Sequence, residues 1–375
     1  GTRTHYASAF ELNLPVLQQV TLDLSGRYDH YKTDAASNHK VTYKAGIEYR
    51  PFQSLLLRGN YATSFLAPDM SALFLGPSGN YQTITDYYLC TTQGGGQDCN
   101  ANWSYEVSGQ DLANPKLKPT TAKSWTVGFV WAPIDRMSLS IDYLHINIAN
   151  EIAPQSADLL LKEEAQCRLG QLPADSPDCM AALSQVVRDP TYGTVDSISQ
   201  YNVNISNEST ESVTAQASYT FNPTRIGTFG LKFDYNDMLK HDYQVYPGSP
   251  EINQLTNPLY SSEFKSITSG ALSWSQNDWG STLYVHRYGP TPNYTALVNG
   301  AGYPGAGRVS PWITWNWSLS YTPHFTKGLS LSLLVDNLTN KMPPKDPSFQ
   351  ASFPYYNTQN YNVYGREIML QAAWK

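Results

Sequence analysis

Hydrophobic and polar residues alternate along many segments of this chain. In the clearest segment, 41–50, one set of alternate positions is Val41, Tyr43, Ala45, Ile47 and Tyr49, and the other set includes Thr42, Lys44, Glu48 and Arg50. A period of two places successive side chains on opposite faces of a β-sheet. The sequence therefore predicts an all-β protein whose strands have one apolar and one polar face.

The alternation predicts about 13 strands. Their expected ranges are 5–14, 19–32, 40–50, 54–65, 122–132, 137–152, 196–222, 227–243, 263–276, 279–289, 309–321, 328–340 and 361–374. The range 196–222 is long enough to be two pieces joined by a bulge near Asn207. Most of these segments exceed the five or six residues usual in globular sheets. They suit strands that cross a bilayer with a tilt, which takes about 9–11 residues.

Short turns and long loops alternate between the predicted strands. Short turns lie near 51–54 and 133–136, and the long loops are expected at about 66–121, 153–194, 244–262, 290–308 and 341–360. Short turns on one rim and long loops on the other are typical of outer-membrane barrels. We therefore predict a transmembrane antiparallel β-barrel that occupies 1–375, and not a soluble sheet with one wet face.

One stretch inside the second long loop has a helical pattern. Residues 156–168 begin with Ser156 or Asp158 as candidate N-caps, and Gly170 follows as a stop signal. We expect this helix to brace the loop.

Composition narrows the function classes. The formal net charge of -6 argues against nucleic acid as a partner, because nucleic acid requires a concentrated basic surface. The chain has 27 Tyr and 9 Trp but no apolar run of the roughly 18 residues that a helical span needs. Aromatic residues gather at both membrane interfaces of a barrel. Four that lie near short turns are predicted to form the periplasmic girdle: Tyr49, Trp131, Tyr321 and Trp374.

The four cysteines form two close pairs, Cys90 with Cys99 and Cys167 with Cys179. Neither pair has CxxC spacing and no histidine cluster accompanies them, so the pattern disfavours a zinc site. Cysteine pairs inside polar loops favour two local disulfides in an oxidising compartment. We expect no bound metal.

Catalytic and cofactor motifs find no support. Residues 300–305 match GxGxxG, but they do not lead from a strand into a helix, and Pro304 opposes helix initiation. The seven histidines are scattered. We therefore expect no cofactor and no enzymatic activity.

Four segments, in order along the chain, resemble motifs of the TonB-dependent receptors. Residues 57–68 (LRGNYATSFLAP) are similar to R-x-x-Y-x-x-S-F-R-A-P, with Leu66 in the place of the last Arg. Residues 114–119 (NPKLKP) are similar to N-P-x-L-x-P-E, with Thr120 in the place of Glu. Residues 335–341 (VDNLTNK) and 364–366 (YGR) resemble the family's final motifs.

This resemblance implies a 22-stranded barrel filled by an N-terminal plug. The chain would be its C-terminal part, located in the bacterial outer membrane in contact with lipid and lipopolysaccharide. The implied partners are a small or oligomeric nutrient and the TonB–ExbB–ExbD complex, which acts through a plug that this chain lacks. An odd number of antiparallel strands agrees with missing strands upstream, because open edges would expose unpaired backbone groups to lipid.

The expected function is energy-driven import of a scarce nutrient: an iron–siderophore, cobalamin, an oligosaccharide or a peptide. Loop aromatics are the candidate ligand contacts: Tyr81, Tyr87, Tyr88, Trp103, Tyr105, Tyr294, Tyr303, Tyr355 and Tyr356. Charged residues of the polar face would line the lumen and either contact the plug or line water: Asp23, Arg27, Lys44, Glu48, Arg50, Asp142, Lys232 and Asp234. The alternatives are a passive substrate-selective porin and a secreted all-β adhesion or sugar-binding protein.

Overall fold

The computed structural model describes residues 1–34, 37–93, 99, 103–204, 207–244, 251–256, 263–292, 308–326, 328–345, 356–357 and 360–374. Its main body is one antiparallel sheet in which each strand pairs with the next one along the path. The strands are β1 (Arg3–Leu17), β2 (Val20–Thr33), β3 (Ser37–Phe52), β4 (Leu55–Leu66), β7 (Thr120–Trp131), β8 (Met137–Ala149), β12 (Asn207–Thr220), β13 (Thr228–Gln244), β15 (Ser266–Gln276), β16 (Trp279–Tyr288), β19 (Trp312–Tyr321), β20 (Leu329–Asp336) and β21 (Glu367–Trp374). The short β14 (Ile252–Asn253) pairs with β13.

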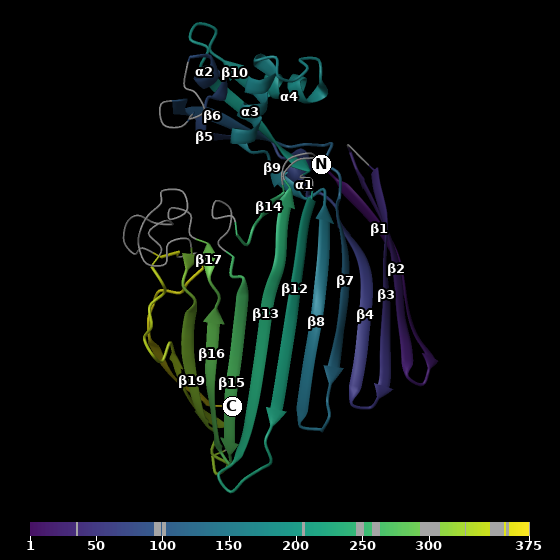
Figure 1. Cartoon of the computed structure of the whole chain (residues 1–375), viewed down its shortest axis with the longest axis vertical. Helices are drawn as coiled ribbons and strands as arrows, with labels where there is room; N and C mark the ends of the chain where they lie inside the picture. The colour runs from purple at the N-terminus through teal and green to yellow at the C-terminus, as the bar shows by residue number, and fades with distance from the viewer. Residues whose placement is uncertain are drawn as a thin grey trace.

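The sheet forms a tall curved wall (Figure 1). All 13 predicted strands are present in the expected order, so the predicted fold class is confirmed. In the described part of the chain, β1 and β21 are the two edges of the wall and do not pair with each other.

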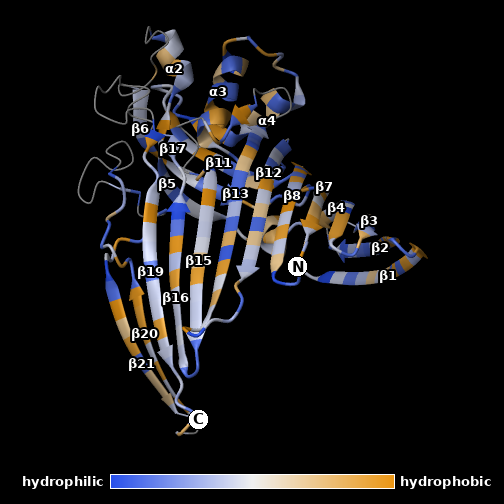
Figure 2. Cartoon of the chain, turned by 60° about the horizontal axis from the view of Figure 1, so that its bottom comes forward, coloured by the Kyte–Doolittle hydropathy of each residue, from blue (hydrophilic) through white to orange (hydrophobic). Residues whose placement is uncertain are grey.

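The two faces of the wall differ in polarity, as the alternation predicts. Val41 is 60% exposed and Ile47 is 48% exposed on one face. Lys44 and Glu48 occupy the opposite face of the same strand because they lie at the intervening positions. Figure 2 shows the resulting bands of hydrophobic and hydrophilic residues along the strands. Apolar side chains exposed over a whole sheet face are normal only where lipid or protein covers them.

The long loops 66–121 and 153–194 contain much more regular structure than their sequence indicates. Together they build a small folded unit, here called the cap (67–119 and 150–204). Its elements are α1 (Met70–Phe74), β5 (Ser78–Thr85), α2 (Tyr87–Thr92), β6 (Ser104–Leu112), β9 (Ile152–Pro154), α3 (Ala157–Arg168), α4 (Pro177–Gln185), β10 (Val186–Arg188) and β11 (Val195–Asn204). The cap stands beyond the long-loop end of the wall (Figure 1).

The segment 196–222 is two strands in two different sheets, and not one strand with a bulge. Its first part, β11, belongs to the cap, and its second part, β12, belongs to the wall. The alternating pattern runs through both, which is why periodicity alone does not separate them.

The cap has its own sheet and core. The strand order is β10-β11-β6-β5, with β9 attached to β11, and β6 and β11 run parallel. This parallel pairing joins the loop after β4 to the loop after β8. Leu160 and Leu161 of α3 are almost completely buried against Val107 and Ile198 of this sheet. Burying each of these leucines stabilises the cap by about 1.5–3 kcal/mol.

The predicted helix is confirmed as α3. The Ser156 hydroxyl accepts a hydrogen bond from the Leu159 N–H, and Gly170 follows the helix with a φ of 70°. This positive φ favours glycine because it has no Cβ. Both expected disulfides are present, Cys90–Cys99 and Cys167–Cys179. None of the described helices is long and apolar enough to cross a bilayer.

Two further short strands lie between β16 and β19 in the sequence and pair antiparallel with each other: β17 (Thr291–Pro292) and β18 (Arg308–Val309).

Candidate functional site

The candidate site is the end of the wall that carries the cap, and Arg188 lies at the centre of the buried charge network of the cap. The Arg188 guanidinium donates two hydrogen bonds to Asp86, at 2.8 and 3.0 Å, and two to Glu164, at 2.8 and 2.7 Å. Its Nη1 also donates to the Gly193 carbonyl at 2.8 Å. Both carboxylates are fully buried. Arg188 therefore ties β10 to the β5–α2 turn and to α3 in the centre of the cap.

Tyr105 completes this cluster. Its hydroxyl donates to Asp86 at 2.7 Å and accepts from the Val195 N–H at 2.8 Å. Burial alone raises the pKa of Asp86, but the hydrogen bonds from Arg188 and Tyr105 outweigh burial and hold this pKa below its usual value. The carboxylate stays charged, so the cluster is an ion network and not a neutral hydrogen-bonded set.

The described aromatic candidates occupy different environments. Tyr81 is 78% exposed on β5. The Tyr87 hydroxyl donates to Asp158, and the Lys162 ammonium lies 5.0 Å from the centre of its ring. The Arg188 guanidinium lies 5.0 Å from the centre of the Tyr88 ring.

Two other candidates, Trp103 and Tyr356, lie within the described residues. The Trp103 carbonyl accepts from the Asp86 N–H at 2.9 Å. Tyr356 is 9% exposed. The remaining candidates, Tyr294, Tyr303 and Tyr355, lie outside the described residues. The structure thus places Tyr88 and Tyr105 against the Arg188 network and Tyr87 against the Asp158–Lys162 ion pair. Ligand contact by the set stays a prediction.

A set of asparagines forms the neck between cap and wall. Asn204 Nδ2 donates to the Lys118 and Asn150 carbonyls, at 2.8 Å each, and Asn204 Oδ1 accepts from the Lys118 N–H. Asn114 Nδ2 donates to the Asn202 carbonyl at 2.8 Å. These amides join the segments that follow the cap strand β6 and the wall strand β8 to the end of the cap strand β11. The neck therefore holds together the places where the chain passes between cap and wall.

Glu151 lies in the same neck. Burial raises the pKa of Glu151 to about 7, and the hydrogen bond and charge of Glu208 contribute to the increase. Next to this pair, His241 contacts Glu208 at 2.7 Å and Glu263 at 2.8 Å. The described residues contain no set of three or more side chains arranged to bind a metal ion.

The polar face of the wall carries a charged cluster near the cap. Arg27 donates two hydrogen bonds to the buried Asp29, at 2.6 and 2.8 Å, and His5 contacts Asp29 at 2.7 Å. His5 stacks on Tyr31 with ring centres 4.1 Å apart. The Arg3 guanidinium lies 5.3 Å from the centre of the same Tyr31 ring.

Further along the polar face, Arg58 and Asp142 form a two-bond ion pair with distances of 2.8 and 2.6 Å. Gly128 lies between them in the register, and a Cβ at Gly128 would come within 2.1 Å of the Asp142 carboxylate. Glycine is thus required for this close approach. Glu48 precedes Arg58 in the same row.

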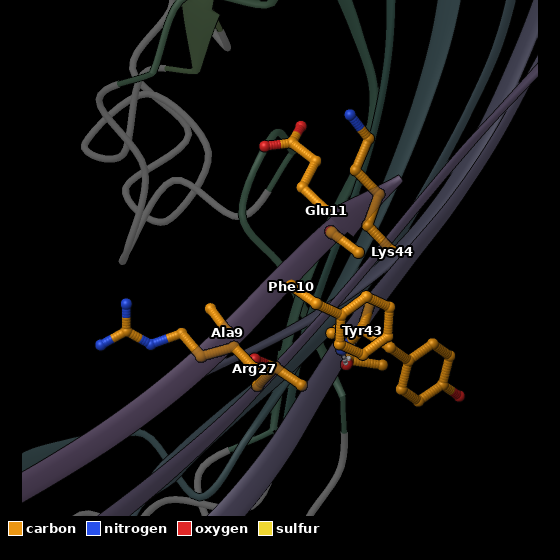
Figure 3. A pocket seen from close by; sticks show the side chains of 10 residues that line it. Ala9, Phe10, Glu11, Arg27, Tyr43 and Lys44 are labelled. Atoms are coloured by element: carbon orange, nitrogen blue, oxygen red, sulfur yellow. Dashed lines mark hydrogen bonds between the residues drawn. The ribbon is translucent and has the colours of Figure 1, made fainter. Parts of the chain in front are cut away.

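Figure 3 shows the same separation at a shallow hollow of about 410 Å³ in the wall: Glu11, Arg27 and Lys44 point to one side, and Phe10 and Tyr43 point to the other. The predicted lumen residues all lie at polar-face positions of the observed register: Asp23, Arg27, Lys44, Glu48, Arg50, Asp142, Lys232 and Asp234. Contact between these side chains and a plug stays a prediction.

The family model of the TonB-dependent receptor-like β-barrel matches residues 1–338. The chain belongs to the TonB-dependent receptor family. The search of curated protein sequences found no match.

Solved structures share the fold of this TonB-dependent receptor barrel. A variant of the ferric enterobactin receptor PfeA from Pseudomonas aeruginosa has 15% identity and a TM-score of 0.64, over 99% of this chain and 45% of PfeA. The siderophore receptor PirA from Acinetobacter baumannii has 15% identity and a TM-score of 0.62, over 99% of this chain and 46% of PirA. The FrpB iron transporter from Neisseria meningitidis has 12% identity and a TM-score of 0.59, over 99% of this chain and 45% of FrpB. The chain spans about half the length of these solved relatives.

In this TonB-dependent receptor barrel, the first two sequence motifs have structural roles at the cap. The LRGNYATSFLAP motif supplies Phe65, which packs edge-on against Tyr31 at 5.7 Å, and Pro68, whose carbonyl accepts from Arg3 at 3.1 Å. The NPKLKP motif supplies Asn114 to the neck and the buried Leu117. Both motifs therefore fix where the cap leaves the wall.

The last two motifs shape the turn after β20. Asn337 bonds to Lys341 in both directions, through its Oδ1 at 2.9 Å and its Nδ2 at 3.0 Å. Asn340 Oδ1 accepts from the Arg366 N–H at 3.0 Å. Asn337, Asn340 and Gly365 all have positive φ. Asparagine and glycine adopt this conformation most readily, which explains these residue types in the motif.

The Arg188 network was not predicted from the sequence. Arg188 lies 102 residues from Asp86 and 24 residues from Glu164. The one usable signal is its place after the apolar pair Val186 and Val187 within an acidic loop, where an unpaired cation would be expected to find a carboxylate.

Proposed function

We propose that this chain is the barrel portion of an outer-membrane receptor that captures a scarce nutrient at its cap end and imports it to the periplasm with TonB-coupled energy. The observation that carries the proposal is the two-faced wall with a cap at its long-loop end, in a chain of the TonB-dependent receptor family. A polar face turned toward an enclosed lumen gives a hydrated route, and an apolar face suits lipid. The family and the solved neighbours are transport receptors, and no enzymatic step is part of the proposal.

The charge of the cap narrows the ligand class. The cap ranges 67–119 and 150–204 contain 13 Asp or Glu and five Lys or Arg, a net charge of -8, whereas the whole chain has a net charge of -6. Of the five basic residues, Arg188, Arg168 and Lys162 are already paired with carboxylates. An acidic surface raises the local concentration of cations and lowers that of anions. We therefore expect neutral or cationic nutrients, such as oligosaccharides or basic peptides, to be admitted more readily than multiply anionic chelates.

The import proposal is tested by growth and uptake in the native host. A deletion of the gene is compared with its complemented strain under iron, cobalamin, amino-acid and carbon limitation. The proposal predicts slower growth of the deletion strain under one limitation only, with rescue by the complemented gene. Equal growth of both strains under all four limitations would contradict nutrient import.

Energy coupling separates the receptor from a passive porin. Uptake of the nutrient identified in the growth test is measured at low external concentration, with and without a functional TonB protein. The receptor proposal predicts saturable uptake that stops without TonB. Uptake that rises linearly with concentration and continues without TonB would instead support a substrate-selective porin.

A further inference from the structure

The apolar face of the first strands ends, toward the cap, in a band of basic side chains. His30 and Lys32 lie on β2, His39 lies on β3 and Lys123 lies on β7; we call these four residues the rim patch. The register pairs Tyr6 with His30 and His30 with His39, so one row of the apolar face runs across β1, β2 and β3. The patch therefore belongs to the outside of the wall, not to the lumen.

Each patch residue lies just beyond an aromatic residue of the same face. His30 and Lys32 follow Tyr28 by two and four positions, and His39 lies four positions from Tyr43 on the cap side. On β7, Lys123 lies two positions from Trp125 on the cap side, and the register places Trp125 beside Tyr61. A second group of aromatic side chains thus lies on the cap side of the wall, opposite the predicted periplasmic girdle near the short turns. Its members are Tyr28, Tyr43, Tyr61 and Trp125. Such rings mark the depth of a membrane interface.

The imidazoles rest on neighbouring rings. The centres of Tyr6 and His30 are 6.5 Å apart, and those of Tyr28 and His39 are 6.4 Å apart. His39, Lys32 and Lys123 are exposed. The side chains of these three residues therefore lie at the surface, where an external partner can reach them. The partly exposed His30 has its Nε2 3.5 Å from the Ser37 hydroxyl.

Carboxylates are absent from this face over a wide area. Among the described positions of β1, β2, β3, β4, β7 and β8, the apolar face carries no Asp or Glu, whereas the polar face of the same strands carries Glu11, Asp29, Glu48 and Asp142. The first carboxylate on the apolar side is Glu211 of β12, which lies 3.5 Å from His145 and marks the end of the basic area.

We propose that the rim patch binds the phosphate groups of lipids in the outer leaflet of the membrane. The inference rests on the proposed outer-membrane location, because only then does the apolar wall below the patch lie in hydrocarbon. Side chains on the cap side of this group of aromatic residues then lie at the depth of the lipid headgroups, where Lys extends toward phosphate. A basic residue near an anionic membrane surface strengthens binding roughly fivefold. A lipid fits better than a soluble anion because its acyl chains cover the wall that continues directly below the patch.

The test uses the native full-length protein in nanodiscs made of neutral lipid with a small fraction of bisphosphorylated lipid A, or of the same glycolipid without phosphate. Bound glycolipid is counted by native mass spectrometry. The variant Lys32→Gln/Lys123→Gln/His30→Gln/His39→Gln removes the patch. The control Lys40→Gln/Lys44→Gln removes two basic residues from the polar face of β3. Heat-modifiable gel migration checks the fold, and Lys32→Gln/Lys123→Gln replaces the fourfold variant if that one does not fold.

We expect the wild type and the control to retain the phosphorylated glycolipid at least roughly tenfold more strongly than the patch variant, and all three to hold the dephosphorylated form equally weakly. Equal retention of both glycolipids by the wild type, or equal loss in the control and the patch variant, would overturn the proposal. A protein that does not enter nanodiscs at all would instead contradict the proposed outer-membrane location. A protein that enters nanodiscs and supports nutrient uptake in the host, but retains both glycolipids equally, would refute this inference alone.

Discussion

Replacing Arg188 by Met tests whether the cap is held by its buried charge network. Methionine keeps much of the side-chain volume and removes all five hydrogen bonds that Arg188 donates to Asp86, Glu164 and Gly193. The two carboxylates are fully buried and Arg188 itself is 7% exposed, so water screens the cluster very little.

The cost follows from the charges left behind. Removing one member of a buried ion pair costs about 3–5 kcal/mol, because the remaining charge loses its compensation. Glu164 keeps its contact with Arg168, and Asp86 keeps the Tyr105 hydroxyl and the Leu89 N–H. These remaining partners place the expected loss near the lower limit, about 3 kcal/mol.

Hydrogen exchange of the native protein in detergent measures this loss where it occurs. Amides of β11 should exchange roughly 100-fold faster in Arg188→Met, because each 1.4 kcal/mol is a factor of ten. Arg58→Met is the matched control, since it breaks an ion pair of the wall that is 45% and 21% exposed, and it should leave cap exchange unchanged. Adding Asp86→Asn and Glu164→Gln to Arg188→Met should restore much of the protection. Unchanged exchange of β11 in Arg188→Met would refute the network as the cap's main polar support.

Three further predictions concern the cap and its neck. Cys167→Ser/Cys179→Ser should lower cap stability by about 3 kcal/mol, which follows from the entropy of closing the loop, and proteolysis between α3 and α4 should report it. Asn204→Ala should speed exchange at the neck while wall strands keep their protection, because two carbonyls and one N–H lose their partner. Since burial raises the pKa of Glu151 to about 7, the folded neck binds a proton that the unfolded chain releases above its ordinary pKa. Neck stability should therefore fall as the pH rises from about 4.5 to 7, and exchange measured across this range should show no such slope in Glu151→Gln.

The wall could be predicted because its strands and their pairing are determined by residues that are close in the sequence. Alternation at Val41, Tyr43 and Ile47 directly encodes a two-faced strand, and short turns separate neighbouring strands that pair in sequence order. The predicted strand boundaries lie within about four residues of the observed ones, with two exceptions: β21 begins at Glu367 and not at 361, and the segment 196–222 contains both β11 and β12.

The cap could not be predicted in the same way because its contacts are distant in sequence. The parallel pairing of β6 with β11 joins residues about ninety positions apart, such as Ser108 and Ser197. The helix α3 has local signals at Ser156 and Gly170 and was found. The residues that surround Arg188 and Tyr105 come from two separate loops. No local sequence pattern in one loop indicates that it contacts the other loop.

The most direct test of the central claim is the accessibility of β3 in the native protein within membranes. All four native cysteines are in disulfides, so single cysteines placed at each position from 41 to 49 can carry a nitroxide label without competing free thiols. The account predicts that oxygen reaches labels at 41, 43, 45, 47 and 49, and that a water-soluble nickel chelate reaches those at 42, 44, 46 and 48. Equal accessibility of odd and even positions, or protection of the odd positions from oxygen, would contradict a wall between lipid and lumen.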